Sequence, residues 1–144
     1  MTCVWKGLLQ ALSPEFKSEH HLSNERSLVN FCKQMVKSNG KKAFMRSGEV
    51  AVHHQGIPVT EKQVSEAIEW ILSYNVNGIQ GGHLTSSCDP FLLLLTAYCD
   101  CSMEHKLYGG HTVVYENPFN HSRLWLKFAS DKGHFWFVGR ETKG

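Results

Sequence analysis

The chain begins its first predicted helix within Thr2-Cys3-Val4-Trp5-Lys6-Gly7-Leu8-Leu9-Gln10-Ala11-Leu12. The apolar residues recur at the i, i+3, i+4, i+7 spacing of a helix with one buried face: Trp5, Leu8, Leu9 and Leu12. This spacing predicts a core helix with Cys3 in its first turn and Thr2 as a candidate N-cap. The unpaired N–H groups and the dipole of a helix N-terminus favour a thiolate, which a cysteine nucleophile requires. A buried cysteine without a chemical role is the alternative.

Length and composition predict one globular domain over residues 1–144. The chain is 42% hydrophobic and 19% charged, which is ordinary for a protein with a packed core. A net charge of +2 without a basic block gives no electrostatic reason to expect nucleic acid as a partner. The longest apolar run, residues 90–97, is too short to cross a bilayer. Five cysteines, an odd number, do not form a secreted-type disulfide framework, and this favours the reducing cytosol.

The first two thirds of the chain read mainly as helices. The apolar spacing from Leu28 to Val36 predicts a helix that ends at Asn39-Gly40, with Cys32 on its buried stripe. A second helix follows the capping-box pattern of Thr60 and Gln63. Residues 41–56 fit either a short strand or an irregular loop. A third helix, buried on most sides, is predicted over 91–98, after Asp89 as N-cap and Pro90 at the first helical position. The period of this apolar run also fits a buried strand.

The last third of the chain reads as β-structure. Strand patterns cover residues 112–115, 124–128 and 134–138, and the turn Ser130-Asp131-Lys132-Gly133 joins the last two. Helices followed by strands predict an α+β fold in which N-terminal helices pack on a small antiparallel C-terminal sheet.

Two residues at opposite ends of the chain are, as a pair, suited to nucleophilic catalysis. Cys3 lies at the start of a predicted buried helix, and His134 opens a late predicted strand directly after a turn. Papain-like cysteine proteases use this arrangement, in which a helix end stabilises the thiolate and a strand delivers an imidazole as general base and acid. We therefore interpret Cys3 and His134 as candidate catalytic residues.

The residues around both positions resemble a known family. Cys3-Val4-Trp5-Lys6-Gly7-Leu8 is similar to the cysteine motif of the ovarian-tumour (OTU) deubiquitinases: Cys, apolar, aromatic, basic, small, aliphatic. His134-Phe135 resembles the family's catalytic histidine and the aromatic that follows it. The small size and the pattern around Cys3 also resemble compact viral enzymes, namely the papain-like proteases of toroviruses and arteriviruses and the leader protease of aphthoviruses. Met1 two residues before Cys3 resembles the start of a domain excised from a polyprotein.

This resemblance implies a compact papain-like, OTU-like fold and a thiol protease without a cofactor. It implies hydrolysis of peptide or isopeptide bonds after the C-terminal glycine of ubiquitin or a ubiquitin-like modifier. The implied setting is a viral polyprotein domain that acts as a monomer in the host cytoplasm and counters innate immunity. The implied partners are ubiquitin, its relatives and the polyprotein itself, with neither nucleic acid nor a membrane.

The family pattern leaves several roles open. Trp136 stands where the family usually has Asn or Asp, so the third catalytic residue is unassigned. Three nearby residues are candidates, namely Asp131, Asn117 and Asn120, and a Cys–His dyad is also possible. Gly133 could let a substrate backbone approach closely, or only complete the turn. Trp136 could line a substrate channel or belong to the core.

A different class of function remains open. Cys99, Cys101 and His105 carry ligand types suited to zinc, with Cys88, His83 or His111 as a fourth, although Cys-x-Cys matches structural zinc sites only partly. The alternative to an enzyme is therefore a non-catalytic ubiquitin- or protein-binding module with structural cysteines, with or without zinc.

Overall fold

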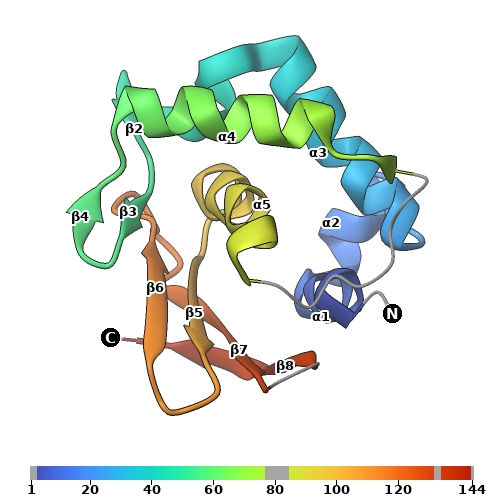
Figure 1. Cartoon of the computed structure of the whole chain (residues 1–144), viewed down its shortest axis with the longest axis vertical. Coiled ribbons are helices and arrows are strands. Elements are labelled where there is room, and N and C mark those ends of the chain that lie inside the picture. Colours follow the sequence, from blue (N-terminus) through green and yellow to red (C-terminus); the bar gives the residue numbers. More distant parts are fainter. Residues whose placement is uncertain (1–2, 77–84, 132–133, 144) are drawn as a thin grey trace.

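The computed structural model describes residues 3–76, 85–131 and 134–143. The helices within them are α1 (Cys3–Ala11), α2 (Pro14–Glu19), α3 (Glu25–Asn39), the 3-10 helix η1 (Gly40–Phe44), α4 (Glu61–Ser73) and α5 (Thr85–Tyr98). The strands are β1 (Met45–Arg46), β2 (Glu49–Val50), β3 (His53–His54), β4 (Ile57–Pro58), β5 (Ser102–Lys106), β6 (Thr112–Glu116), β7 (Leu124–Ser130) and β8 (Phe135–Thr142). The predicted α+β class is confirmed (Figure 1).

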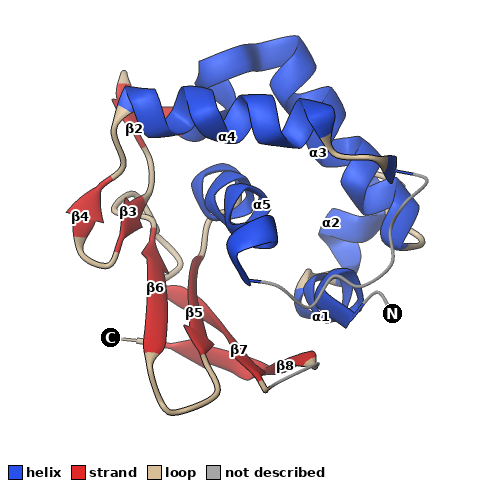
Figure 2. Ribbon diagram, in the orientation of Figure 1, coloured by secondary structure: helices blue, strands red, loops and turns tan. Residues whose placement is uncertain are grey.

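The main sheet has the strand order β4-β3-β6-β5-β7-β8, and its pairing is mixed (Figure 2). β5 pairs antiparallel with β6 but parallel with β7, with Met103 opposite Leu126. The expectation of a purely antiparallel C-terminal sheet is therefore wrong. The predicted hairpin of the last two strands is present, since β7 and β8 pair antiparallel from Leu124–Thr142 to Ser130–Phe135.

Helix α5 is central to the core and lies between the sheet and the layer formed by α3 and α4 (Figure 1). Its apolar residues are buried on several sides: Phe91, Leu92, Leu94, Leu95 and Ala97. The helix begins at Thr85, so Asp89 is inside it and is not its N-cap, contrary to the expectation from the Asp-Pro pair. The Asp89 carboxylate instead accepts a hydrogen bond from the hydroxyl of Tyr115 on β6.

Local signals placed the other long helices correctly. Helix α3 has an Asn24 cap and buries Cys32 completely, as its apolar stripe predicts. Helix α4 begins with the predicted capping box, in which Thr60 accepts from the Gln63 N–H and Gln63 accepts from the Thr60 N–H. Residues 41–56 form η1, the β1–β2 hairpin and the strand β3.

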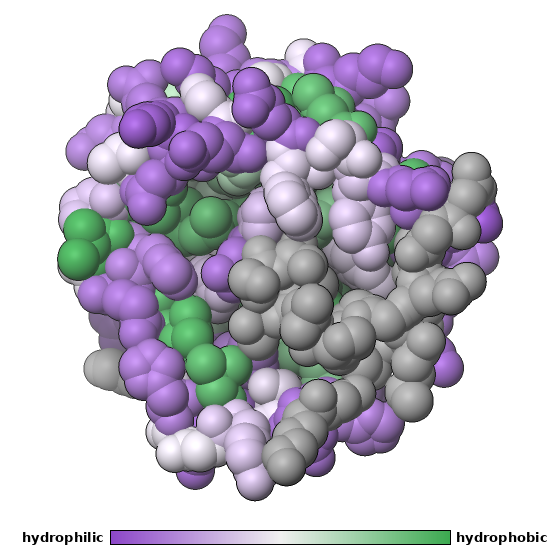
Figure 3. All heavy atoms as spheres, viewed as in Figure 1, coloured by the Kyte–Doolittle hydropathy of each residue, from purple (hydrophilic) through white to green (hydrophobic). Residues whose placement is uncertain are grey.

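Polar side chains cover most of the outer surface of the α3 and α4 layer (Figure 3). Among the described residues, no helix is both long enough and apolar enough to cross a bilayer. The predicted glycine-rich link at 77–82 and the predicted Thr2 cap lie outside the described residues.

Candidate active site

Helix α1 starts at Cys3, as predicted, and the side chain of Trp5 holds its first turn in the core. The Trp5 side chain is fully buried, and its indole N–H donates a 3.3 Å hydrogen bond to the hydroxyl of Tyr74. The Trp5 ring also packs edge-on against Phe91 with centroids 4.7 Å apart. The first turn of α1 is therefore fixed by aromatic contacts to α5 and to the end of α4.

Helix α1 packs along the edge strand β8, and the two elements run in the same direction. A Cβ placed on Gly7 would lie 3.0 Å from the Phe135 ring and 3.5 Å from the Phe137 backbone nitrogen. Further along, the Arg140 guanidinium donates a 2.5 Å hydrogen bond to the Ala11 carbonyl. Going back from the Gly7–Phe135 contact, Cys3 is about 6 Å along the helix axis and His134 about 3 Å along the strand. Both sequence-predicted catalytic residues therefore lie at the same end of the α1–β8 pair.

His134 lies one residue before β8, at the end of a closed turn. The Asp131 backbone N–H donates to the His134 carbonyl at 2.9 Å, and the His134 backbone N–H donates to Asp131 Oδ1 at 3.1 Å. His134 is exposed to solvent, so a substrate can reach this part of the turn. Asp131 is thus held on the same turn as His134, whereas Gly133 lies outside the described residues.

Trp136 is 42% exposed, so the interpretation that it belongs to the core is wrong. Successive side chains of a strand point to opposite faces, and Phe135, its neighbour, packs against α1. Trp136 therefore projects from the face of β8 that is turned away from α1.

Asn117 and Asn120 lie at the other end of the sheet from His134. The Asn117 N–H donates to Ser102 Oγ at the start of β5, and Asn120 Nδ2 donates to the Leu124 carbonyl at the start of β7. His134 follows the far end of β7, which is seven residues or about 20 Å long. Of the three candidates for the third catalytic residue, only Asp131 is near His134.

His105 is a buried histidine at the His134 end of the sheet that the sequence did not single out for this site. It is 1% exposed, its Nε2 lies 2.8 Å from Ser130 Oγ, and its ring packs edge-on against Phe135 at 4.9 Å. Burial lowers the pKa of His105 to about 4, so the imidazole is neutral at neutral pH. Its Nδ1 is buried and has no hydrogen-bond partner among the described residues. No sequence signal marks it, because Met103 is the only apolar residue in Ser102–Lys106 and the stretch does not alternate.

The structure does not bring the candidate zinc ligands together as a set of three. Cys101 immediately precedes β5 and His105 is the fourth residue of that strand, so the two lie four residues or about 13 Å apart. Within the described ranges, no three His, Cys, Asp or Glu side chains are grouped to hold a metal ion. Cys88 and His83, two of the possible fourth ligands, have no described side chains. The proposed set of Cys99, Cys101 and His105 is therefore wrong.

Comparison with known proteins finds no matching family model, no matching curated protein and no matching solved structure.

Proposed function

We propose that this protein is a papain-like, OTU-like cysteine protease with Cys3 as nucleophile and His134 as general base and acid. The observation that carries the proposal is the packing of α1 along β8, with the Gly7 position 3.0 Å from the Phe135 ring. This packing supports a site in which the N-terminus of a core helix and the residue before the last strand face the same substrate. The order of cysteine before histidine along the chain agrees with it.

The chemistry follows from the two residues. His134 takes the proton of the Cys3 thiol, and the resulting thiolate, favoured by the helix N-terminus, attacks the carbonyl carbon of the scissile bond. The oxyanion is stabilised by the backbone N–H of Cys3 as one donor. The C–N bond then breaks, and His134 gives a proton to the leaving amine. Water, deprotonated by His134, attacks the thioester and releases the acid product and the Cys3 thiol.

The substrate class rests on the resemblance of Cys3–Leu8 and His134-Phe135 to the OTU motifs. We infer hydrolysis after the C-terminal glycine of ubiquitin or a ubiquitin-like modifier, in peptide or isopeptide linkage. A viral origin, processing of the parent polyprotein and removal of ubiquitin from host defence proteins in the cytoplasm belong to the same proposal. Solvent exposure of His134 is compatible with a protein substrate.

The decisive experiment is labelling with ubiquitin that carries a thiol-reactive group at its C-terminus. We expect a covalent adduct with the unmodified chain, none with Cys3→Ala, and hydrolysis of a fluorogenic ubiquitin substrate that is lost in Cys3→Ala and in His134→Ala. Cys88→Ser and His121→Ala are the matched controls, because each removes the same residue type elsewhere. An adduct that persists in Cys3→Ala, or complete absence of reaction with folded protein and with ubiquitin-like probes, would overturn the proposal in favour of a binding module.

A further inference from the structure

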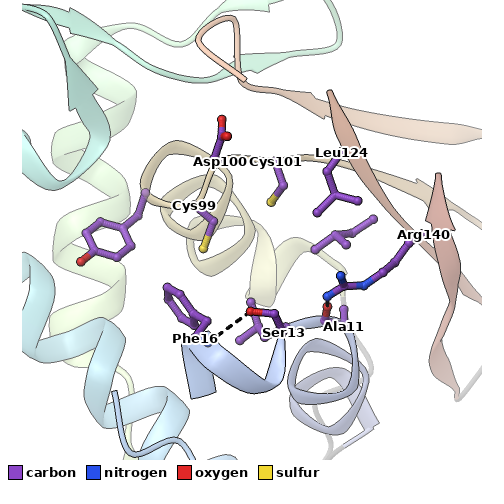
Figure 4. Close-up of a pocket in the computed structure, with 11 residues that line it drawn as sticks. Ala11, Ser13, Phe16, Cys99, Asp100, Cys101, Leu124 and Arg140 are labelled. Atoms are coloured by element: carbon purple, nitrogen blue, oxygen red, sulfur yellow. Dashed lines mark hydrogen bonds between the residues drawn. The ribbon is translucent and has the colours of Figure 1, made fainter. Parts of the chain in front are cut away.

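A cavity of about 290 Å³ lies at the end of the sheet opposite to His134. It is bounded by the junction of α1 and α2, by the connection from α5 to β5, and by the first residues of β7 (Figure 4). Its apolar walls come from Leu12, Phe16, Leu124 and Leu126. None of the residues assigned to the proposed protease site lines this cavity, so its chemistry is a separate question.

Two thiols point into this cavity from one tight turn. Cys99 and Cys101 flank Asp100 between α5 and β5, and the Cys101 N–H donates a 2.9 Å hydrogen bond back to the Cys99 carbonyl. Both sulfur atoms face the cavity in Figure 4, and both cysteines are free. A hydrogen bond from Cys99 and burial raise the pKa of the Cys101 thiol well above its usual value. The two sulfur atoms are thus neighbours, one half-buried and the other only 3% exposed.

One positive and one negative side chain, Arg140 and Asp100, lie near the two thiols. The Arg140 guanidinium reaches the cavity wall, where it is held by the Ala11 carbonyl, and its charge lowers the pKa of the Cys101 thiol, whereas the charge of Asp100 raises it. The Asp100 carboxylate points away from the cavity (Figure 4) and accepts hydrogen bonds from the His121 and Ser122 N–H groups at 2.9 and 3.2 Å. The cavity therefore presents two sulfur ligands, a nearby cation and an apolar lining.

We propose that Cys99 and Cys101 bind one Cu(I) ion as a two-coordinate dithiolate site. Thiolates are soft ligands that favour Cu(I), zinc and iron–sulfur clusters, and of these Cu(I) accepts linear coordination by two sulfurs. Structural zinc requires four ligands, and the described part of the chain supplies no group of even three at this place. The bis-thiolate complex carries one negative charge, which the Arg140 guanidinium attracts and the neighbouring Asp100 carboxylate repels. Each thiol releases its proton to solvent as its sulfur–copper bond forms, and the oxidation state of copper does not change.

The test uses the whole chain, reduced and free of oxygen, titrated against the coloured Cu(I) complex of bicinchoninate. The chain should remove copper from the chelator. Cys99→Ser and Cys101→Ser should each weaken copper binding more than about 100-fold. Replacing a residue that only hydrogen-bonds to a metal ligand already lowers metal affinity by up to about 100-fold, and each of these variants removes a ligand itself. The double variant Cys3→Ser/Cys88→Ser is the matched control and should still hold one equivalent at the affinity of the unmodified chain. Circular dichroism establishes that each serine variant is folded.

Two further measurements sharpen the result. Arg140→Gln should weaken Cu(I) binding about fivefold while Arg140→Lys should not, because only the first removes the charge. Copper should also raise the Tm of the unmodified chain and leave that of Cys99→Ser/Cys101→Ser unchanged. Equal copper affinity in the unmodified chain and in Cys99→Ser/Cys101→Ser would overturn the proposal. So would loss of binding in the Cys3→Ser/Cys88→Ser control, or a preference for Zn(II) over Cu(I).

Discussion

Gly7 lies directly against Phe135, and a Cβ at this position would be 3.0 Å from the Phe135 Cε1 and 3.1 Å from its Cδ1. This contact determines how closely α1 approaches β8, and with it the distance between the first turn of α1 and the turn that holds His134. It also gives a physical reason for a small residue at the fifth position of the cysteine motif.

Gly7→Val should lower the free energy of unfolding by about 1–3 kcal/mol, because the added methyl groups must displace the buried Phe135 ring or the Phe137 backbone. Urea denaturation measures this difference. Gly139→Ala, on the same strand β8, is the matched control, since a Cβ there meets no atom within 4 Å among the described residues. Equal stability of Gly7→Val and Gly139→Ala would contradict the close packing of α1 on β8.

His105 should make the stability of the protein depend on pH. The pKa of its imidazole is about 4 in the folded protein, below the ordinary 6.5 of the unfolded chain. Between these values only the unfolded chain takes up the proton, so the free energy of unfolding should fall as the pH is lowered from about 6.5 to about 4, by at most about 3 kcal/mol.

Urea denaturation at several pH values, compared between the unmodified chain and His105→Gln, measures this effect. The glutamine variant should show a flatter dependence on pH, because its amide does not titrate. His121→Gln, which removes an exposed histidine, should keep the original slope. The same slope in all three proteins would show that His105 is not the titrating group.

Asp131 should position His134 in the proposed reaction. Asp131→Ala removes the Oδ1 acceptor of the 3.1 Å hydrogen bond from the His134 backbone N–H, which closes the turn that carries His134, and should reduce kcat/KM on a ubiquitin substrate about 10-fold or more. Asp131→Asn keeps an oxygen acceptor and should lose less. Steady-state kinetics with a fluorogenic substrate distinguish the two variants, and an unchanged kcat/KM in Asp131→Ala would exclude this role.

Asn117 should be a structural residue without a part in catalysis. Its buried Nδ2 donates to the Thr96 and Cys99 carbonyls at 2.8 and 3.1 Å, and its Oδ1 accepts from the Phe119 N–H at 2.8 Å. Asn117→Ala should therefore cost about 2–3 kcal/mol of unfolding free energy, because buried backbone groups lose their partners. Asn30→Ala, on the exposed side of α3, should change stability by less than about 0.5 kcal/mol.

Activity provides the second readout for Asn117. At a temperature where Asn117→Ala is fully folded, its kcat on a ubiquitin substrate should equal that of the unmodified chain. A large loss of kcat in the folded variant would place Asn117 in the catalytic machinery, against its position about 20 Å from His134 along the sheet.

The amino-acid sequence by itself determined the features that depend on local pattern. The spacing of apolar residues predicted α1 with Cys3 in its first turn, and it predicted that Cys32 is buried, where desolvation raises its thiol pKa to about 12. The cap of α4 was predicted at Thr60, and the alternation after residue 124 predicted the β7–β8 hairpin. Each of these signals is contained within a few turns or one hairpin of the chain.

Only the tertiary structure decided which distant segments meet. Strand β5 was not predicted, because Met103 is the only apolar residue in Ser102–Lys106 and the parallel pairing of this strand with β7 joins segments more than 20 residues apart. The extended backbone of β5 separates Cys101 from His105, and the packing of the sheet buries His105 beside Phe135. Asp89 was read as a helix cap because a cap and an interior Asp-Pro look alike locally, and the partner that distinguishes them, Tyr115, lies 26 residues away. Strand order and burial are set by the free energy of the whole packed core, which no short stretch of sequence contains.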